Sequence, residues 1–115
     1  MEAAPRFLQG VFAFKGSGFD KPTALDGKLA YTVPSDKRAQ LIYLRAGNSS
    51  AELVYLLLMR DGKPMRYFPV GAKSSVHVAL VVTEDIFPET KLEVLLAAPA
   101  DVSGSLVIDI GLLEI

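Results

Sequence analysis

Short apolar segments, each about as long as one β-strand, alternate along the chain with clusters of glycine, proline, asparagine, aspartate and serine. This pattern is typical of all-β proteins, because those residue types favour the turns that separate strands. No segment has the three-to-four-residue apolar periodicity of a convincing helix. The sequence therefore predicts about eight strands, over residues 7–14, 29–33, 40–45, 52–60, 63–70, 75–82, 91–97 and 105–115.

The length of 115 residues suits one domain, and we expect residues 1–115 to form a single antiparallel β-sandwich with essentially no helix. The topology stays open between a jelly roll and an immunoglobulin-like arrangement. Residues 15–28, which contain Gly16 and Gly18, are expected to form a flexible loop. Residues 83–90 are expected to form a second loop with room for one helical turn.

One hairpin can be placed from its turn residues. Asp61-Gly62 tolerates the positive φ angles of a tight turn, so it should join the strands 52–60 and 63–70. Pro64 and Pro69 interrupt the second of these strands. Because proline donates no hydrogen bond to a neighbouring strand, we expect 63–70 to lie at a sheet edge.

The four tyrosines are evenly spaced, at Tyr31, Tyr43, Tyr55 and Tyr67, with twelve residues from each to the next. Twelve residues correspond to about one strand and one turn. The spacing is compatible with a meander that places the four side chains on one sheet face. It is also compatible with coincidence among hairpins of similar length.

Composition excludes several functional classes. The chain has no cysteine, which rules out disulfides, thiolate metal sites and cysteine nucleophiles. The net charge is −1 and the basic residues form no stripe, so we expect no nucleic-acid partner. No apolar run reaches the roughly 20 residues of a membrane-spanning helix, and no signal peptide is visible. We therefore expect a cytoplasmic protein without a membrane span.

The apolar content of 50% is high for a small domain, and several strands are apolar on both faces. In the segment 53–59, Val54, Leu56 and Leu58 can fill the core, but the alternate residues need another cover. A second subunit is the simplest cover. We therefore expect a homo-oligomer whose interface contains the alternate side chains of that strand, Leu53, Tyr55, Leu57 and Met59.

The search for reactive groups predicts no enzyme, cofactor or metal site. His77 is the only histidine, and no nucleophile motif accompanies it. The acid pairs Glu84 with Asp85 and Glu89 with Glu93 lie in or beside the 83–90 loop, where acids are usually solvated. The triplet 48–50 matches a glycosylation acceptor, a match that also arises by chance.

Two functions follow from these observations. The first is a non-enzymatic interaction or assembly module that self-associates through an apolar sheet face. The alternative is a small-ligand module, with carbohydrate as a possible ligand, that uses loop residues. The candidate ligand contacts are Phe19 and Phe87 in loops, together with His77 and Arg66.

The rhythm of strands and turns resembles a known family. Its elements are Arg45-Ala46-Gly47-Asn48, Arg60-Asp61-Gly62-Lys63-Pro64, Ser75-Val76-His77-Val78 and Phe87-Pro88-Glu89-Thr90. This chain is similar in these elements to small bacterial β-sandwich proteins of the sensory rhodopsin transducer type. The resemblance implies an oligomeric, non-enzymatic protein linked to signalling or small-ligand binding. The aromatic start of that family is not evident, and no functional residue is carried over.

The two ends of the chain show a second likeness. Phe7-Leu8-Gln9-Gly10 and Gly104-Ser105-Leu106 are similar to segments of nucleoplasmin-like jelly rolls, which form rings. The acidic tract of those histone chaperones is missing here.

Overall fold

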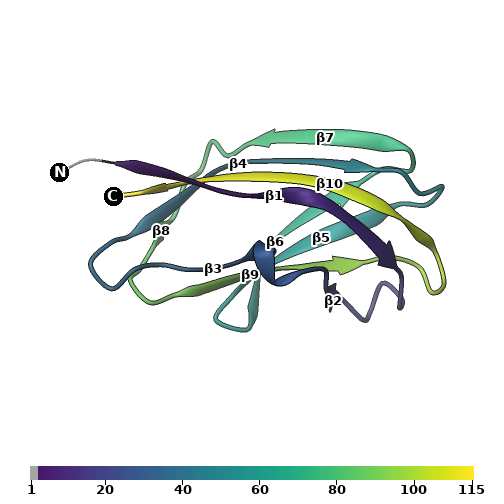
Figure 1. Ribbon diagram of the computed structural model, residues 1–115, viewed down its shortest axis with the longest axis horizontal. Helices are drawn as coiled ribbons and strands as arrows, with labels where there is room; N and C mark the ends of the chain where they lie inside the picture. Colours follow the sequence, from purple (N-terminus) through teal and green to yellow (C-terminus); the bar gives the residue numbers. More distant parts are fainter. Residues whose placement is uncertain (1–2) are drawn as a thin grey trace.

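Two antiparallel sheets face each other across an apolar core in the computed structural model, which describes residues 3–115 (Figure 1). We call them sheet I and sheet II. Sheet I contains, in spatial order, β1 (Ala4–Lys15), β10 (Ser103–Glu114), β4 (Ala39–Asn48) and β7 (Ser74–Ala79), and β8 (Asp85–Ile86) also pairs with β4. Sheet II contains β2 (Thr23–Ala24), β9 (Lys91–Ala97), β5 (Val54–Arg60) and β6 (Lys63–Val70), and β3 (Ala30–Thr32) also pairs with β9.

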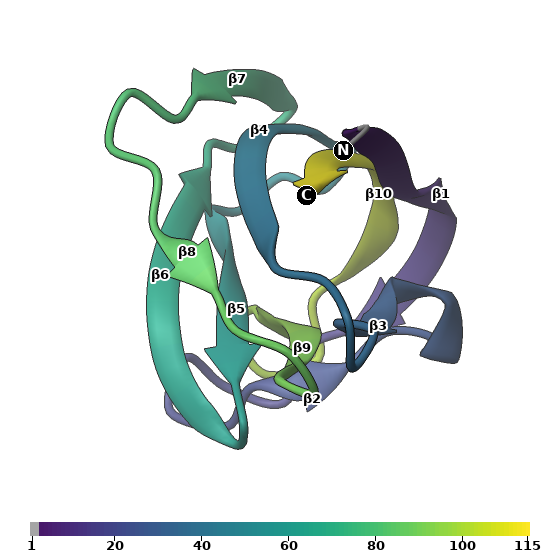
Figure 2. The same ribbon diagram turned by 90° about the vertical axis from the view of Figure 1, so that its left-hand side faces the viewer.

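The strand order decides between the two expected topologies. Both β2 and β3 pair with β9, and both β7 and β8 pair with β4, so each of these two pairs occupies one position in its sheet. Counted in this way there are eight positions, and the chain crosses repeatedly from one sheet to the other (Figure 2). This is a jelly roll. The all-β sandwich prediction is confirmed, and the only helical segment in residues 3–115 is the 3-10 turn Gly27–Leu29.

The core lies between the sheets and is built from alternate residues of the strands. In β5 the inward set is Val54, Leu56 and Leu58, as predicted, and all three are buried. The largest side chains that are fully enclosed are Leu29, Leu44, Leu56, Ile86, Leu92, Leu106, Ile108, Ile110, Val33, Val54 and Val70.

No helix among residues 3–115 is long and apolar enough to cross a membrane.

The predicted hairpin is present. β5 and β6 pair antiparallel and are joined at Asp61 and Gly62, whose φ angles are 49° and 78°. Both angles are positive, as a tight turn of the mirror-image type requires. β6 lies at the edge of sheet II, so the prediction made from Pro64 and Pro69 is also confirmed.

Three predicted segments differ from the structure. The loop predicted over 15–28 contains the short strand β2 and the start of the 3-10 turn Gly27–Leu29. The strand predicted over 75–82 ends at Ala79, and Val81 and Val82 are exposed in the following loop, Val81 at 94%. Their β-branched side chains favour a strand, but no neighbouring strand pairs with them there. The 83–90 loop contains the short strand β8, and the helical turn that we allowed for is absent.

Gly16, in the 15–28 loop, is held in close contact with another backbone segment and does not make the loop flexible. A Cβ atom at this position would lie 2.1 Å from the Pro99 carbonyl oxygen. The Gly16 amide also donates to the Val102 carbonyl oxygen at 2.7 Å, and its own carbonyl accepts from the Asp101 amide at 3.0 Å. Gly16 therefore lets two backbone segments approach closely, which corrects the expectation of a merely flexible loop.

The four tyrosines do not share a face, so the meander interpretation was wrong. Tyr43 lies in sheet I, whereas Tyr31, Tyr55 and Tyr67 lie in sheet II. Tyr31 packs against the core, and Tyr55 and Tyr67 lie on the outer face. The spacing of twelve residues thus reflects segments of similar length that are distributed over both sheets.

Candidate functional site

The outer face of sheet II is apolar across three strands. We call residues directly opposite one another on neighbouring strands a rung. One rung consists of Tyr55 with Pro69 on β6 and Ala97 on β9. The next consists of Leu57 with Tyr67 on β6 and Leu95 on β9. Neither rung contains a charged residue, and the predicted orientation of Leu57 away from the core is confirmed.

Part of this face is already covered within one chain. The Phe19 ring stacks on Tyr55 with 6.1 Å between ring centroids, and the Tyr55 hydroxyl donates to the Phe19 carbonyl oxygen at 2.6 Å. Tyr67 lies beyond Tyr55, with their centroids 5.7 Å apart. Leu57 is only 4% exposed, whereas Leu53 and Tyr67 remain 48% and 60% exposed. We call the set Phe19, Leu53, Tyr55, Leu57, Met59, Tyr67 and Leu95 the apolar face.

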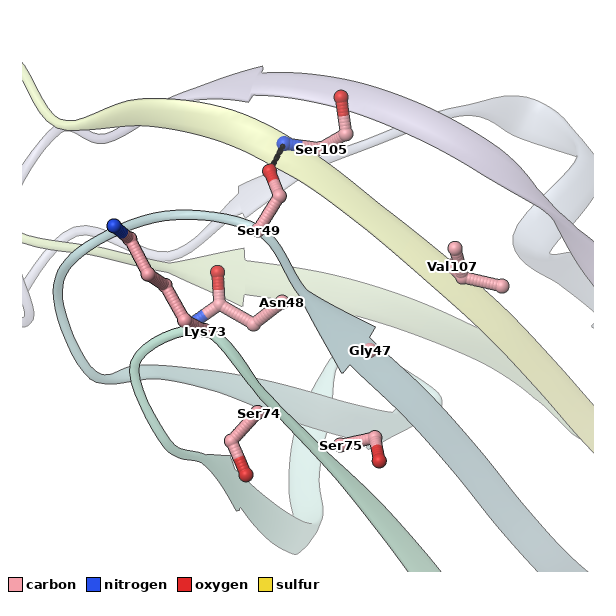
Figure 3. A pocket seen from close by; sticks show the side chains of 8 residues that line it. All are labelled: Gly47, Asn48, Ser49, Lys73, Ser74, Ser75, Ser105 and Val107. Atoms are coloured by element: carbon pink, nitrogen blue, oxygen red, sulfur yellow. Dashed lines mark hydrogen bonds between the residues drawn. The ribbon is translucent and has the colours of Figure 1, made fainter.

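The outer face of sheet I, unlike that of sheet II, is crossed by a trough. The trough lies where β4 carries a glycine. Gly47 lies opposite Val107 of β10 and Ser75 of β7, and these three residues line two adjoining depressions. Figure 3 shows the hydroxyl-rich end, where Ser49 accepts a hydrogen bond from the Ser105 amide at 2.8 Å. That end is lined by Gly47, Asn48, Ser49, Lys73, Ser74, Ser75, Ser105 and Val107.

The other end of the trough contains a charged cluster. Asp109 accepts a hydrogen bond from Arg45 at 2.6 Å on one carboxylate oxygen and from the Tyr43 hydroxyl at 3.0 Å on the other. The Arg45 guanidinium also lies 5.0 Å from the centre of the Tyr43 ring, and His77 meets that ring edge-on. The nearby Tyr43 side chain, and then Asp109, raise the pKa of Arg45 above its ordinary value.

This cluster depends on a glycine below it. A Cβ atom at Gly111 would lie 2.1 Å from the Tyr43 ring, so the ring rests directly on the β10 backbone. Sequence reasoning named His77 but missed Tyr43, Arg45 and Asp109. The alternation of β4 could have placed Tyr43 and Arg45 on one face, but nothing local indicates their pairing with Asp109, which is 64 residues from Arg45.

The other candidate ligand contacts lie apart from the trough. Phe87 is exposed in the loop after β8, beside a depression lined by residues 35–38 and by Ile115. Arg66 is engaged with Glu84 at 2.7 Å. The structure therefore brings Phe19 to the apolar face and His77 to the trough, and it unites none of Phe19, Phe87, His77 and Arg66 in one site.

The acids considered for catalysis point to different partners. Glu84 binds Arg60 at 3.2 Å as well as Arg66, whereas Asp85 binds Arg38 at 3.3 Å and accepts from Gln40 at 2.9 Å. Adjacent acids on an extended chain point to opposite sides, and each of these is held by bases on its own side. Residues 3–115 contain no group of three or more potential metal ligands.

Asn48 has a structural role that its glycosylation triplet does not suggest. Its side-chain amide is buried and donates to the carbonyl oxygens of Glu52, Val70 and Gly71 at 2.9, 3.3 and 3.1 Å. Its oxygen accepts from the amide and hydroxyl of Ser50 at 2.9 and 2.8 Å. Asn48 thus ties the β4–β5 loop to the β6–β7 turn, and its nitrogen is enclosed in the folded chain.

No family model matches the chain, and no curated protein sequence matches it either. Among solved structures, the chain is similar to an exo-β-1,3-galactanase from Phanerochaete chrysosporium, which was solved with galactose. The identity is 10% and the TM-score is 0.40, and the likeness covers 94% of this chain but only 29% of that one. The resemblance to the sensory rhodopsin transducer type stays a prediction.

Proposed function

We propose that the protein is a non-enzymatic β-sandwich module that self-associates through the apolar face of sheet II. The observation that supports this function is the pair of successive rungs without a charged side chain, with Tyr67 and Leu53 exposed beside them. Contiguous apolar patches on a monomer are usually small and often functional. Tyrosine is favoured in interfaces, because its ring packs while its hydroxyl reaches the wet margin.

The occupant that we propose for this face is a second copy of the chain. One end of the face carries both signs, since Glu93 of β9 lies opposite Met59 and Lys91 lies 3.9 Å from Glu93. In a twofold contact the same surface meets itself, so a margin with both signs can place each charge near its opposite. The net charge of −1 also opposes association of two copies very little.

Sedimentation of three proteins tests this proposal. We expect the unmodified chain to sediment as a dimer or larger species at micromolar concentration. Tyr67→Lys should shift it to a folded monomer with the circular dichroism spectrum of the unmodified chain, because Tyr67 is exposed and makes no core contact. Its melting temperature should lose only the part that association adds. Val82→Lys, an exposed apolar residue outside this face, should leave the oligomer intact. An unmodified chain that is monomeric, or a Tyr67→Lys protein that still associates, would overturn the proposal.

The alternative function is small-ligand binding through loop residues. The positions of the two loop phenylalanines do not favour it. Phe19 is held against Tyr55, and Phe87 lies beside a different depression. A thermal-shift screen of sugars tests it, since a ligand that binds only the folded state raises the melting temperature.

A further inference from the structure

We infer that the trough on the outer face of sheet I is a binding site for a sugar acid, meaning a saccharide that carries a carboxylate. The site uses the opposite sheet from the apolar face, so it is independent of self-association. It spans three strands, with residues from β10, β4 and β7. Its two overlapping ends are shallow and open to solvent, with volumes of about 680 and 530 Å³, which leaves room for an extended ligand that lies along the sheet.

The trough exists because Gly47 leaves its centre unfilled. A Cβ atom at Gly47 would touch only the Val107 side chain, at an ordinary distance of 3.9 Å. No backbone strain or close approach therefore requires glycine at this position. The missing side chain leaves an open floor between Val107 and Ser75, where Val107 offers apolar contact to the C–H groups of a sugar ring.

The walls supply the polar groups that recognise hydroxyls. Asp109 keeps further acceptor capacity on both carboxylate oxygens, because each accepts only one hydrogen bond from a protein side chain. His77 adds a ring nitrogen at the same end. At the opposite end the lining serines add hydroxyls, which both donate and accept. Sugar hydroxyls also donate and accept, so this set matches a polyhydroxylated ligand.

The charge balance selects an acidic saccharide over a neutral one. Asp109 is compensated by Arg45, with which it forms an ion pair at 2.6 Å. Lys73, at the hydroxyl-rich end, has no ion-pair partner among residues 3–115. The lining residues therefore carry one more positive than negative charge. A carboxylate on the ligand near Lys73 would form a charge-assisted hydrogen bond, which is stronger than a neutral one.

Calorimetric titration with digalacturonic acid and with neutral galactobiose tests the ligand class. We expect the acid to bind at least about tenfold more tightly than the neutral sugar. Lys73→Gln, which keeps most of the side-chain length but loses the charge, should bring the affinity for the acid down to that for the neutral sugar. Equal affinity of the unmodified protein for both sugars, or an unchanged preference in Lys73→Gln, would overturn the assignment of an acidic ligand.

A second variant tests the location. Gly47→Val should abolish binding of both sugars, because its side chain fills the floor, while the melting temperature stays the same or rises, since valine suits a central strand. Gly27→Ala, at an exposed glycine with no atom within 4 Å of the added Cβ, is the matched control and should bind normally. The site would be refuted if the unmodified chain bound neither sugar, or if Gly47→Val bound them undiminished. It would also be refuted if inorganic phosphate displaced digalacturonic acid as well as unlabelled digalacturonic acid does.

Discussion

The phenol of Tyr31 donates a hydrogen bond to the carboxylate of Glu114, which is only 4% exposed. Tyr31 belongs to β3 in sheet II and Glu114 to β10 in sheet I, so the contact joins the two sheets near the chain termini (Figure 1). Arg6 lies 3.3 Å from the other oxygen of the same carboxylate. A buried carboxylate is tolerated here because both of its oxygens have partners.

Tyr31→Phe should destabilise the fold by about 1–3 kcal/mol, because it leaves a buried carboxylate oxygen without a donor. Urea unfolding measures this change in the free energy of unfolding. Tyr67→Phe removes a hydroxyl from an exposed ring and should cost nothing measurable. Equal effects of the two substitutions would show that the Tyr31 hydroxyl contributes no stability.

The same residue should affect stability at high pH. Burial, and then the hydrogen bond to Glu114 and its charge, raise the pKa of Tyr31 well above its ordinary value of 10.0. Because the folded-state pKa is raised, the protonated phenol contributes stability that is complete below pH 10 and declines as the pH rises further. Stability of the unmodified chain should therefore fall more steeply above pH 10 than that of Tyr31→Phe. Parallel curves would contradict the linkage.

Leu56 and Leu57 are adjacent but should respond differently to arginine. Leu56 is fully enclosed in the core, so Leu56→Arg should unfold the chain, because an unpaired buried charge costs several kcal/mol. Leu57 lies on the outer face but is only 4% exposed, so Leu57→Arg should also lower the free energy of unfolding. The cost should be smaller than for Leu56→Arg, because a long side chain on the outer face can carry its guanidinium toward solvent. That protein should still fold but fail to associate. Circular dichroism and sedimentation of both variants check this pair, and the reverse pattern would mean that the faces are misassigned.

Gly62→Val should lower the free energy of unfolding by about 1–2 kcal/mol, because a β-branched residue fits a positive φ poorly. No atom lies within 4 Å of a Cβ at this position, so the effect would come from backbone conformation alone. Gly62→Asn should cost less, since asparagine adopts this conformation more readily. Thermal unfolding compares the two, and equal costs would count against a conformational cause.

Gly16→Ala should destabilise the chain by about 2 kcal/mol or more, because the added methyl group overlaps the Pro99 carbonyl and cannot be relieved by side-chain movement. Gly27→Ala, with open space around it, serves as the control and should be neutral or slightly stabilising. Chemical denaturation measures both. A neutral Gly16→Ala would show that the loop yields easily.

Asn48→Asp should be among the most destabilising single substitutions, by roughly 2–4 kcal/mol, since it replaces a donor facing three carbonyl oxygens with a buried acceptor. Asn48→Ala should cost less than Asn48→Asp, because it adds no charge. Urea unfolding ranks the two variants. A milder effect for aspartate would mean that this amide is not the tie between the loops.

The sequence by itself determined the strand content, the Asp61-Gly62 hairpin, the edge position of β6 and the two faces of β5. Each of these follows from local chemistry, because turn residues and the alternation of side chains act within a few positions. The inward orientation of Leu56 and the outward orientation of Leu57 could be predicted without knowing which strands pair with β5. The jelly-roll order was not accessible in this way, since it depends on pairings between distant strands such as β1 with β10.

Tertiary structure alone decided the features that join distant segments. Ile42 is the extra residue of a bulge between β4 and β10, so Leu41 and Leu44 both face the core although they lie three positions apart. Alternation read from the sequence cannot show such a shift. The Tyr31–Glu114 contact and the Arg45–Asp109 pair join residues 83 and 64 positions apart. Only folding determines such neighbours, because the free energy that holds them comes from the packing of both sheets.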